Sequence, residues 1–291
     1  MMAIVKIGHD TIGCGLPCQP IVGPCTVTRD VSDLVSMLAD TGVMWIRGGC
    51  WKPRSTSISF RGFGIRGVEW LLRAARANTI KTVFMEVMDT RHIDDVRYVH
   101  QCVGFEGTIV LWVGARTSNQ TLLEALGSQD EYPVMLKHHP WDTTIDPLLT
   151  RAQFVTNGEM KWDDTGALLV DPDHEQNSTV LLCVRGLDKR APDQHRPLRF
   201  SPNPEWITEL HERSLHPVVW DPSHIAGRSE FVWQILRAGL NRQPEVVMVE
   251  CWFDRDDHRK ALCDGDQAIP ISQVPSILKM VKEHNALHYG V

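Results

Sequence analysis

The chain has 291 residues, of which 43% are hydrophobic and 23% are charged. This is enough apolar material for one large core, in either one barrel or two smaller domains. The formal net charge of -6 gives no reason to expect nucleic acid or a membrane as a partner, while local Arg and Lys clusters leave small anions open. The N-terminal MMAIVKIGHD lacks the features of a signal peptide, and no apolar run approaches the roughly 18 residues of a membrane span. We therefore predict a soluble, cytoplasmic protein.

The chain contains eight cysteines and no secretion signal. In this setting cysteines are better interpreted as free thiols, small buried hydrophobic residues or metal ligands than as a disulfide framework. Cys14 and Cys18 are spaced as a possible pair, but no matching Cys/His pair accompanies them, which disfavours a zinc knuckle.

Short apolar runs recur along the chain, and the apolar residues within each run are continuous rather than alternating. They lie at 21–22, 43–46, 82–85, 109–113, 134–136, 180–184, 217–220 and 246–249. Such runs are typical of strands that are buried on both faces. Segments with apolar residues at helical spacing lie between them, for example at 31–39, 68–77, 121–126, 206–212 and 230–240. This alternation predicts an α/β fold, the (β/α)8 TIM barrel.

Two further segments lie outside this alternation. The first twenty or so residues precede the first strand, and we expect a short cap over the bottom of the barrel. Residues 158–172 have two short runs around an Asp-Asp-Thr-Gly turn, which predicts an inserted hairpin. We expect a single barrel domain over 1–291, with no separate regulatory domain.

In a barrel, the active site lies at the carboxyl ends of the strands, so the residues after each apolar run carry the functional signal. One group there combines a thiol, an imidazole and carboxylates. Its members are Cys25, His224, Glu250 and Asp264. This donor set suits a divalent transition metal, and Mn, Fe, Co and Zn all remain open.

A second group consists of cations at the same strand ends. Its members are Arg47, Lys52, Arg54, Arg116, Lys137 and Arg185. Such a ring suits the binding of two phosphates and a carboxylate. Each residue alone also has an ordinary explanation, because a single Cys is commonly buried and a single Arg is commonly solvated. Their joint occurrence at strand ends favours the functional interpretation.

Five motifs occur in the order typical of one enzyme family. They are GPC at 23–25, RGGxxKPRS at 47–55, GAR at 114–116, DPSHxAG at 221–227 and DGDQ at 264–267. With these motifs the sequence, from about Ile21 to Gln267, resembles the 3-deoxy-heptulosonate 7-phosphate (DAHP) synthases. It more distantly resembles the 3-deoxy-octulosonate 8-phosphate synthases, which are built on the same barrel.

The resemblance implies roles for individual residues. The four members of the thiol, imidazole and carboxylate group would hold the catalytic metal. The residues that would bind phosphoenolpyruvate are Arg47, Lys52, Arg116, Lys137 and Arg185. The residues that would face the phosphate of the aldose are Arg54, Ser55 and Thr56. The candidates for proton transfer and other catalytic roles are Lys137, Glu86 and Asp266.

The resemblance also implies an activity and an assembly. The KPRS form of the acceptor loop is typical of the DAHP enzymes, which makes erythrose 4-phosphate the leading acceptor and the first step of the shikimate pathway the leading reaction. The product would be DAHP, released with phosphate. A homotetramer or homodimer is expected.

The sequence departs from the family pattern mainly near the acceptor side. His138 and His139 replace an Arg-Gly pair, Trp252 replaces a His, and Ser57-Ile58 replace Pro-Tyr. These changes leave open a related synthase with a different phosphorylated aldose, and also a catalytically silent barrel. A structural zinc protein is disfavoured, because the ligands are spread over the whole barrel mouth. For the two loop histidines a contact with substrate or metal stays open, but loop histidines are more often exposed to solvent than catalytic, so we expect exposure.

Overall fold

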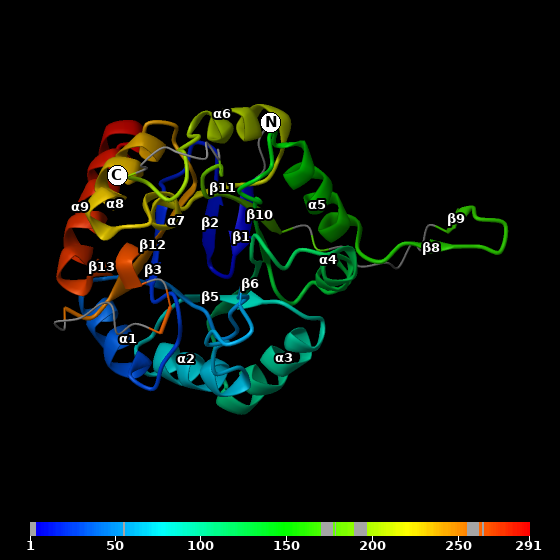
Figure 1. Ribbon diagram of the computed structural model, residues 1–291, viewed down its shortest axis with the longest axis horizontal. Helices are drawn as coiled ribbons and strands as arrows, with labels where there is room; N and C mark the ends of the chain where they lie inside the picture. The colour runs from blue at the N-terminus through cyan, green and yellow to red at the C-terminus, as the bar shows by residue number, and fades with distance from the viewer. Residues whose placement is uncertain are drawn as a thin grey trace.

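A closed barrel of parallel strands forms the centre of the molecule (Figure 1). The computed structural model describes residues 4–54, 56–169, 177, 179–188, 197–254, 262–263 and 265–291. In barrel order, the strands are β3 (Gln19–Gly23), β4 (Trp45–Gly48), β5 (Thr82–Val87), β6 (Thr108–Val113), β7 (Val134–Lys137), β10 (Val180–Val184), β11 (Val218–Trp220) and β12 (Val246–Trp252). Strand β12 pairs with both β11 and β3, which closes the ring. The predicted (β/α)8 barrel is confirmed.

Helices surround the barrel and cover its outer surface (Figure 1). They are α1 (Val31–Asp40), α2 (Ile65–Ala77), α3 (Arg91–Val103), α4 (Gln120–Gly127), α5 (Asp146–Asn157), α6 (Glu205–Arg213), α7 (Pro222–Ala226), α8 (Ser229–Leu240) and α9 (Val274–Tyr289). The five helices named from the sequence are present with similar bounds. Helices α3, α5, α7 and α9 were not named from the sequence.

Two separate cores explain why the strands are apolar on both faces. Alternate strand residues point in opposite directions, so Ile21 lies in the barrel interior and Val22 lies between barrel and helices. The inner core includes Trp45, Phe84 and Trp112. These large side chains fill the barrel, so the interior is a packed floor beneath the polar residues at its mouth.

A short hairpin closes the bottom of the barrel. It consists of β1 (Ile4–Ile7) and β2 (Asp10–Gly13), which pair antiparallel. Ile7 and Ile12 are fully buried in the inner core, and Trp45 Nε1 donates a hydrogen bond to Asp10 Oδ2 at 2.8 Å. The expected cap is therefore confirmed, and it contributes side chains to the barrel interior.

The inserted hairpin projects away from the barrel as an arm (Figure 1). Strands β8 (Lys161–Trp162) and β9 (Leu168–Leu169) pair antiparallel. Asp163 stabilises the turn by accepting hydrogen bonds from the backbone of Thr165 and Ala167. The described part confirms the predicted hairpin, while 170–172 lie outside the described residues. No helix in the described part of the chain is long and apolar enough to cross a bilayer.

Candidate active site

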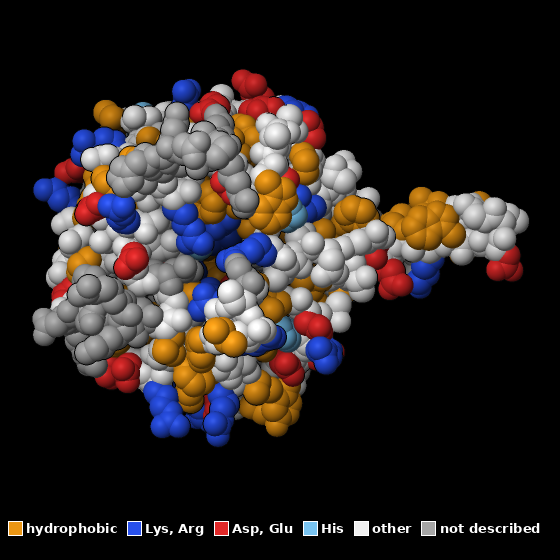
Figure 2. Space-filling view, in the orientation of Figure 1, with side chains coloured by type: hydrophobic (Ala, Val, Ile, Leu, Met, Phe, Trp, Pro, Cys, Tyr) orange, Lys and Arg blue, Asp and Glu red, His pale blue; other side chains and the backbone are white. Residues whose placement is uncertain are grey.

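The cations predicted from the sequence gather around one cavity at the carboxyl ends of the strands. Figure 2 shows Lys and Arg side chains collected in the central hollow of this face. The cavity is lined by Arg47, Lys52, Pro53, Arg54, Glu86, Trp112, Gly114, Ala115, Arg116, Lys137, Arg185 and His224. The space between these side chains, open solvent included, is about 460 Å³.

The barrel strands fix the positions of these side chains. Arg47 lies on β4, Glu86 on β5, and Lys137 ends β7. The floor beneath them is aromatic, because the Trp112 ring lies 4.9 Å from the Arg47 guanidinium and 5.4 Å from Lys137 Nζ. A cation above an aromatic face is attracted to it, so the floor helps to hold both charges. A Cβ at Gly114 would lie too close to Glu86 Oε1, so a larger residue there would require the Glu86 carboxylate to shift.

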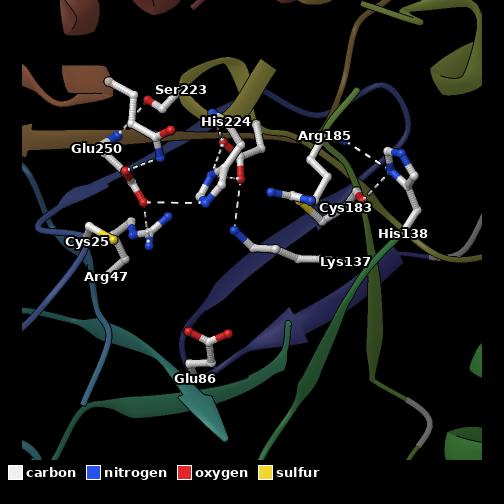
Figure 3. Close-up of polar contacts among 12 residues, drawn as sticks. Cys25, Arg47, Glu86, Lys137, His138, Cys183, Arg185, Ser223, His224 and Glu250 are labelled. Carbon is white, nitrogen blue, oxygen red and sulfur yellow. Dashed lines mark hydrogen bonds and ion pairs between the residues drawn. The ribbon is translucent and has the colours of Figure 1, made fainter. Parts of the chain in front are cut away.

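Three of the cations have buried carboxylate partners. Arg47 contacts Glu250 at 2.9 Å and Lys52 contacts Glu86 at 3.3 Å. Lys137 Nζ donates to Asp221 Oδ2 at 2.8 Å, and Figure 3 shows the Lys137 amine pointing toward the side of the site where His224 lies. Asp221 is fully buried. Burial opposes its ionisation, but the contacts with His224 and Lys137 hold its pKa well below the usual value.

Arg185 differs from these three, because it has no carboxylate partner among the described residues. Its side chain is 6% exposed, and its Nε atom has no hydrogen-bond partner there. Burial lowers the pKa of Arg185 to about 10. The guanidinium lies 5.1 Å from the Phe200 ring and lines the cavity. A buried cation without a carboxylate in direct contact is costly, so this position is suited to an anionic ligand.

Three of the four residues predicted to bind a metal, Cys25, His224 and Glu250, lie at the same mouth. The His224 Nδ1 atom lies 2.9 Å from Asp221, which directs Nε2 toward Glu250 Oε1 at 3.8 Å (Figure 3). Burial lowers the pKa of His224 to about 4, so the ring is neutral at pH 7. A neutral imidazole held by a carboxylate is the usual form of a metal-ligating histidine. Cys25 contributes a buried thiol on the same side, beside Arg47 in Figure 3.

The donor set therefore fits a divalent metal by its chemistry: sulfur, neutral nitrogen and carboxylate oxygen. Within the described ranges, however, His, Cys, Asp and Glu side chains do not form an assembled group of three or more. Cys25 contacts Cys263, while Glu250 contacts Arg47. Asp264 lies outside the described residues.

Of the described residues predicted to bind the aldose phosphate, Arg54 lines the cavity and Thr56 does not. Arg54 lines it and donates to Phe60 O at 2.7 Å and to Leu262 O at 3.1 Å. Thr56 is exposed and hydrogen-bonds to Ser59, and it does not line the cavity. Ser55 lies outside the described residues. Asp266 is exposed in the short helix η2 (Gly265–Gln267) and also does not line the cavity.

The expectation that both loop histidines are exposed is wrong. His138 is fully buried and accepts a hydrogen bond from Arg185 N at 3.1 Å (Figure 3). Its Nε2 atom contacts Gly186 O at 2.9 Å. His139 is partly buried. Through these contacts His138 fixes the backbone around Arg185.

Sequence reasoning missed several residues that shape the site. Asp221 holds Lys137 and His224, and Gln267 Nε2 donates to Glu250 Oε2 at 2.6 Å. Cys263 lies against Cys25. Asp221 follows a predicted strand, so its position alone was a usable signal. The contacts of Gln267 and Cys263 depend on how a loop folds back and have no signal in the local sequence.

Comparisons with known proteins agree with this geometry. The model of the DAHP synthetase I family matches residues 3–288. Phospho-2-dehydro-3-deoxyheptonate aldolase of Thermotoga maritima is 28% identical over 283 residues, which are 96% of this chain and 73% of that protein. The 2-dehydro-3-deoxyphosphooctonate aldolase of Geotalea uraniireducens is 23% identical over 311 residues, 99% of each protein.

A solved structure of the Thermotoga maritima aldolase, described as a DAHP synthase, superposes with a TM-score of 0.79 at 26% identity. The match covers 99% of this chain and 74% of that chain. The agreement in sequence and barrel geometry extends over nearly all of the present chain. The chain therefore belongs to the DAHP synthetase I family, and the protein is an aldolase-type transferase that joins phosphoenolpyruvate to a phosphorylated aldose.

Proposed function

We propose that this enzyme condenses phosphoenolpyruvate with erythrose 4-phosphate and water to give DAHP and phosphate, in a reaction that depends on a divalent metal and begins the shikimate pathway. The observation that carries the proposal is the cavity of six cations in which Arg185 is buried without a carboxylate partner among the described residues. Phosphoenolpyruvate bears a phosphate and a carboxylate, so it supplies the anions that such a cavity requires.

The paired cations support the binding of phosphoenolpyruvate in a defined orientation. Arg47 and Lys137 are each held by a buried carboxylate and by the Trp112 ring. Their positions are therefore set before the substrate arrives, which lowers the entropic cost of binding. Arg185 offers a planar pair of donors to one anionic group, and Lys137 offers a point charge to another.

The metal would be held by Cys25, His224 and Glu250, together with Asp264. When bound, a divalent ion supplies Lewis-acid polarisation of the aldehyde oxygen. Mn, Fe, Co and Zn all accept this donor set. Asp221 supports the arrangement, because its hydrogen bond to His224 Nδ1 fixes the ring and leaves Nε2 for coordination.

Residues of the chain would then position the attacking water and transfer protons. C3 of phosphoenolpyruvate attacks the aldehyde carbon and C2 becomes electron-deficient, so a water oxygen adds to C2 and phosphate departs with cleavage of its C–O bond. Glu86 lines the cavity, is 5% exposed and is held by Lys52. We assign it the role of orienting that water and accepting its proton. Lys137 is the candidate donor to the new hydroxyl oxygen, since its amine reaches the cavity from β7.

The second substrate, the aldose phosphate, needs its own phosphate-binding residue. Arg54 lines the cavity beside the phosphoenolpyruvate cations and is the described residue best placed to bind the phosphate of the aldose. Because other relatives are named 2-dehydro-3-deoxyphosphooctonate aldolase, a different phosphorylated aldose is the alternative acceptor. The departures from the family pattern near this side are compatible with either sugar.

Phosphate release from phosphoenolpyruvate tests the proposal. The wild-type protein, loaded with Mn²⁺, is assayed with erythrose 4-phosphate, ribose 5-phosphate, arabinose 5-phosphate and no aldose, beside a Cys25→Ala variant. We expect turnover with erythrose 4-phosphate that Cys25→Ala abolishes. Turnover only with another aldose phosphate would identify a related synthase. Absence of turnover with every sugar, despite bound metal, would identify a catalytically silent barrel.

A further inference from the structure

The His138 ring connects two neighbouring strands of the barrel at its mouth. His138 follows Lys137, the last residue of β7, and its backbone N–H donates to Cys183 O at 3.0 Å, which continues the pairing of β7 with β10. Its Nδ1 atom accepts a hydrogen bond from Arg185 N at 3.1 Å (Figure 3). Its Nε2 atom lies 2.9 Å from Gly186 O. One fully buried ring therefore contacts the backbone of Arg185 and of the residue after it.

These contacts define the protonation of His138. Because Nδ1 accepts the Arg185 N–H, the single ring proton of neutral histidine lies on Nε2, which donates it to Gly186 O. Burial, with the nearby charge of Arg185, lowers the pKa of His138 to about 3, so the ring is neutral at pH 7. A neutral ring in this form satisfies one backbone donor and one backbone acceptor at once. An apolar side chain in its place would leave both groups without these partners, which is costly in a buried segment.

The segment after β10 packs closely around the same ring. Gly186 has a φ of +87°, and a Cβ there would lie 2.7 Å from Phe200 Cβ, so the backbone passes directly against Phe200. The Phe200 ring lies 5.1 Å from the Arg185 guanidinium. Trp206 meets the His138 ring edge-on, with the ring centroids 5.1 Å apart. The Arg185 side chain is thus held at its backbone by His138 and at its guanidinium by Phe200.

The support from the backbone matters most for Arg185. Lys137 is held directly by the buried carboxylate of Asp221, whereas Arg185 has no carboxylate in direct contact among the described residues. We propose that His138 is a positioning residue for phosphoenolpyruvate, which aims the Arg185 guanidinium at the anion by fixing the backbone from which it extends. The inference rests on the proposed function, because it takes Arg185 as a contact of phosphoenolpyruvate. A planar guanidinium binds an anion through two donors only in a narrow range of orientations, so a small shift of its backbone weakens the contact.

Two substitutions at position 138 separate hydrogen bonding from packing. His138→Phe keeps an aromatic ring against Trp206 and removes both ring hydrogen bonds. His138→Asn keeps an acceptor near the place of Nδ1, within reach of Arg185 N, and loses most of the packing. The dissociation constant of phosphoenolpyruvate is measured by calorimetry on the Mn²⁺-loaded proteins, beside urea unfolding. We expect it to rise about tenfold in His138→Phe and less than about threefold in His138→Asn, although His138→Phe is the better packed variant.

Steady-state kinetics and two further variants complete the experiment. In His138→Phe the KM of the aldose phosphate should change less than the KM of phosphoenolpyruvate. Arg185→Lys reports the loss of the guanidinium contact itself. His284→Phe is the matched control, because His284 is 8% exposed on α9 and does not line the cavity. It should bind phosphoenolpyruvate as the wild type does.

The outcomes distinguish the inference from the proposed function. Wild-type affinity in His138→Phe, together with weakened binding in Arg185→Lys, would overturn the inference and leave the proposed function intact. Weaker binding in His138→Asn than in His138→Phe, in the same order as their stabilities, would show that His138 acts by packing alone and would also overturn it. So would an equal loss in His284→Phe. No binding of phosphoenolpyruvate by the wild type would overturn both.

Discussion

Lys137 and His224 are joined through one buried carboxylate, because Asp221 accepts a hydrogen bond from Lys137 Nζ at 2.8 Å and contacts His224 Nδ1 at 2.9 Å. The side chain assigned to phosphoenolpyruvate and the one assigned to the metal thus share a support. A change at Asp221 should affect both binding events at once. We therefore expect the binding of phosphoenolpyruvate and the binding of the metal to be coupled.

The variant Asp221→Asn tests this coupling. An amide removes the charge that balances Lys137 and weakens the hold on His224, and outer-shell partners of metal ligands commonly contribute roughly 10- to 100-fold to metal affinity or activity. We expect losses of that size in both metal affinity, measured by equilibrium dialysis, and kcat. Asp142→Asn is the control, since Asp142 pairs with Arg151 outside the cavity lining. A loss of kcat with unchanged metal affinity would show that Asp221 supports Lys137 alone.

Arg185 should act on the binding of phosphoenolpyruvate. Lysine in its place keeps the charge and loses the planar pair of donors, and a hydrogen bond to a charged group contributes about 1.5–3 kcal/mol. We expect Arg185→Lys to raise the KM for phosphoenolpyruvate by roughly 10- to 100-fold, with a smaller change in the KM of the aldose. The exposed Arg213→Lys serves as control. An increase confined to the aldose would move Arg185 to the other substrate.

His138 makes the stability of the protein depend on pH. Burial, with the nearby charge of Arg185, lowers its pKa from 6.5 to about 3. Below pH 6.5 the unfolded chain gains a proton that the folded protein does not accept, so stability falls as the pH decreases from 6.5 toward 3. The loss amounts to about 1.4 kcal/mol per pH unit within this window.

Urea unfolding at pH 5 and pH 7 measures this effect. His138→Gln should remove the His138 share of the difference between the two pH values, although it also lowers stability at pH 7 through lost hydrogen bonds. The exposed His288→Gln should retain the wild-type difference. If His138→Gln keeps the wild-type difference in unfolding free energy between pH 5 and pH 7, the pKa of His138 is the same in the folded and unfolded states.

The sequence predicted the barrel because its strands are apolar on both faces, a pattern that local composition reveals. It also predicted the cation ring, since residues that end barrel strands converge whatever the details of packing. The sequence did not predict which side chains of the site contact one another. Asp221 and Cys263 find their partners only through the closed barrel, and the burial of His138 depends on the backbone around Arg185. Such contacts join positions far apart in the chain, and a single sequence does not show which distant residues will meet.

The projecting arm should contribute little to the stability of the barrel. Trp162 is 58% exposed, and its strand pairs only with β9 among the described strands. We expect Trp162→Ala to change the free energy of unfolding by less than about 0.5 kcal/mol, as for other surface substitutions. Trp206→Ala is the matched control, because Trp206 is 6% exposed and packs on His138. It should cost about 3–5 kcal/mol. A large loss for Trp162→Ala, accompanied by a smaller assembly in sedimentation, would show instead that the arm is covered by a second copy of the chain.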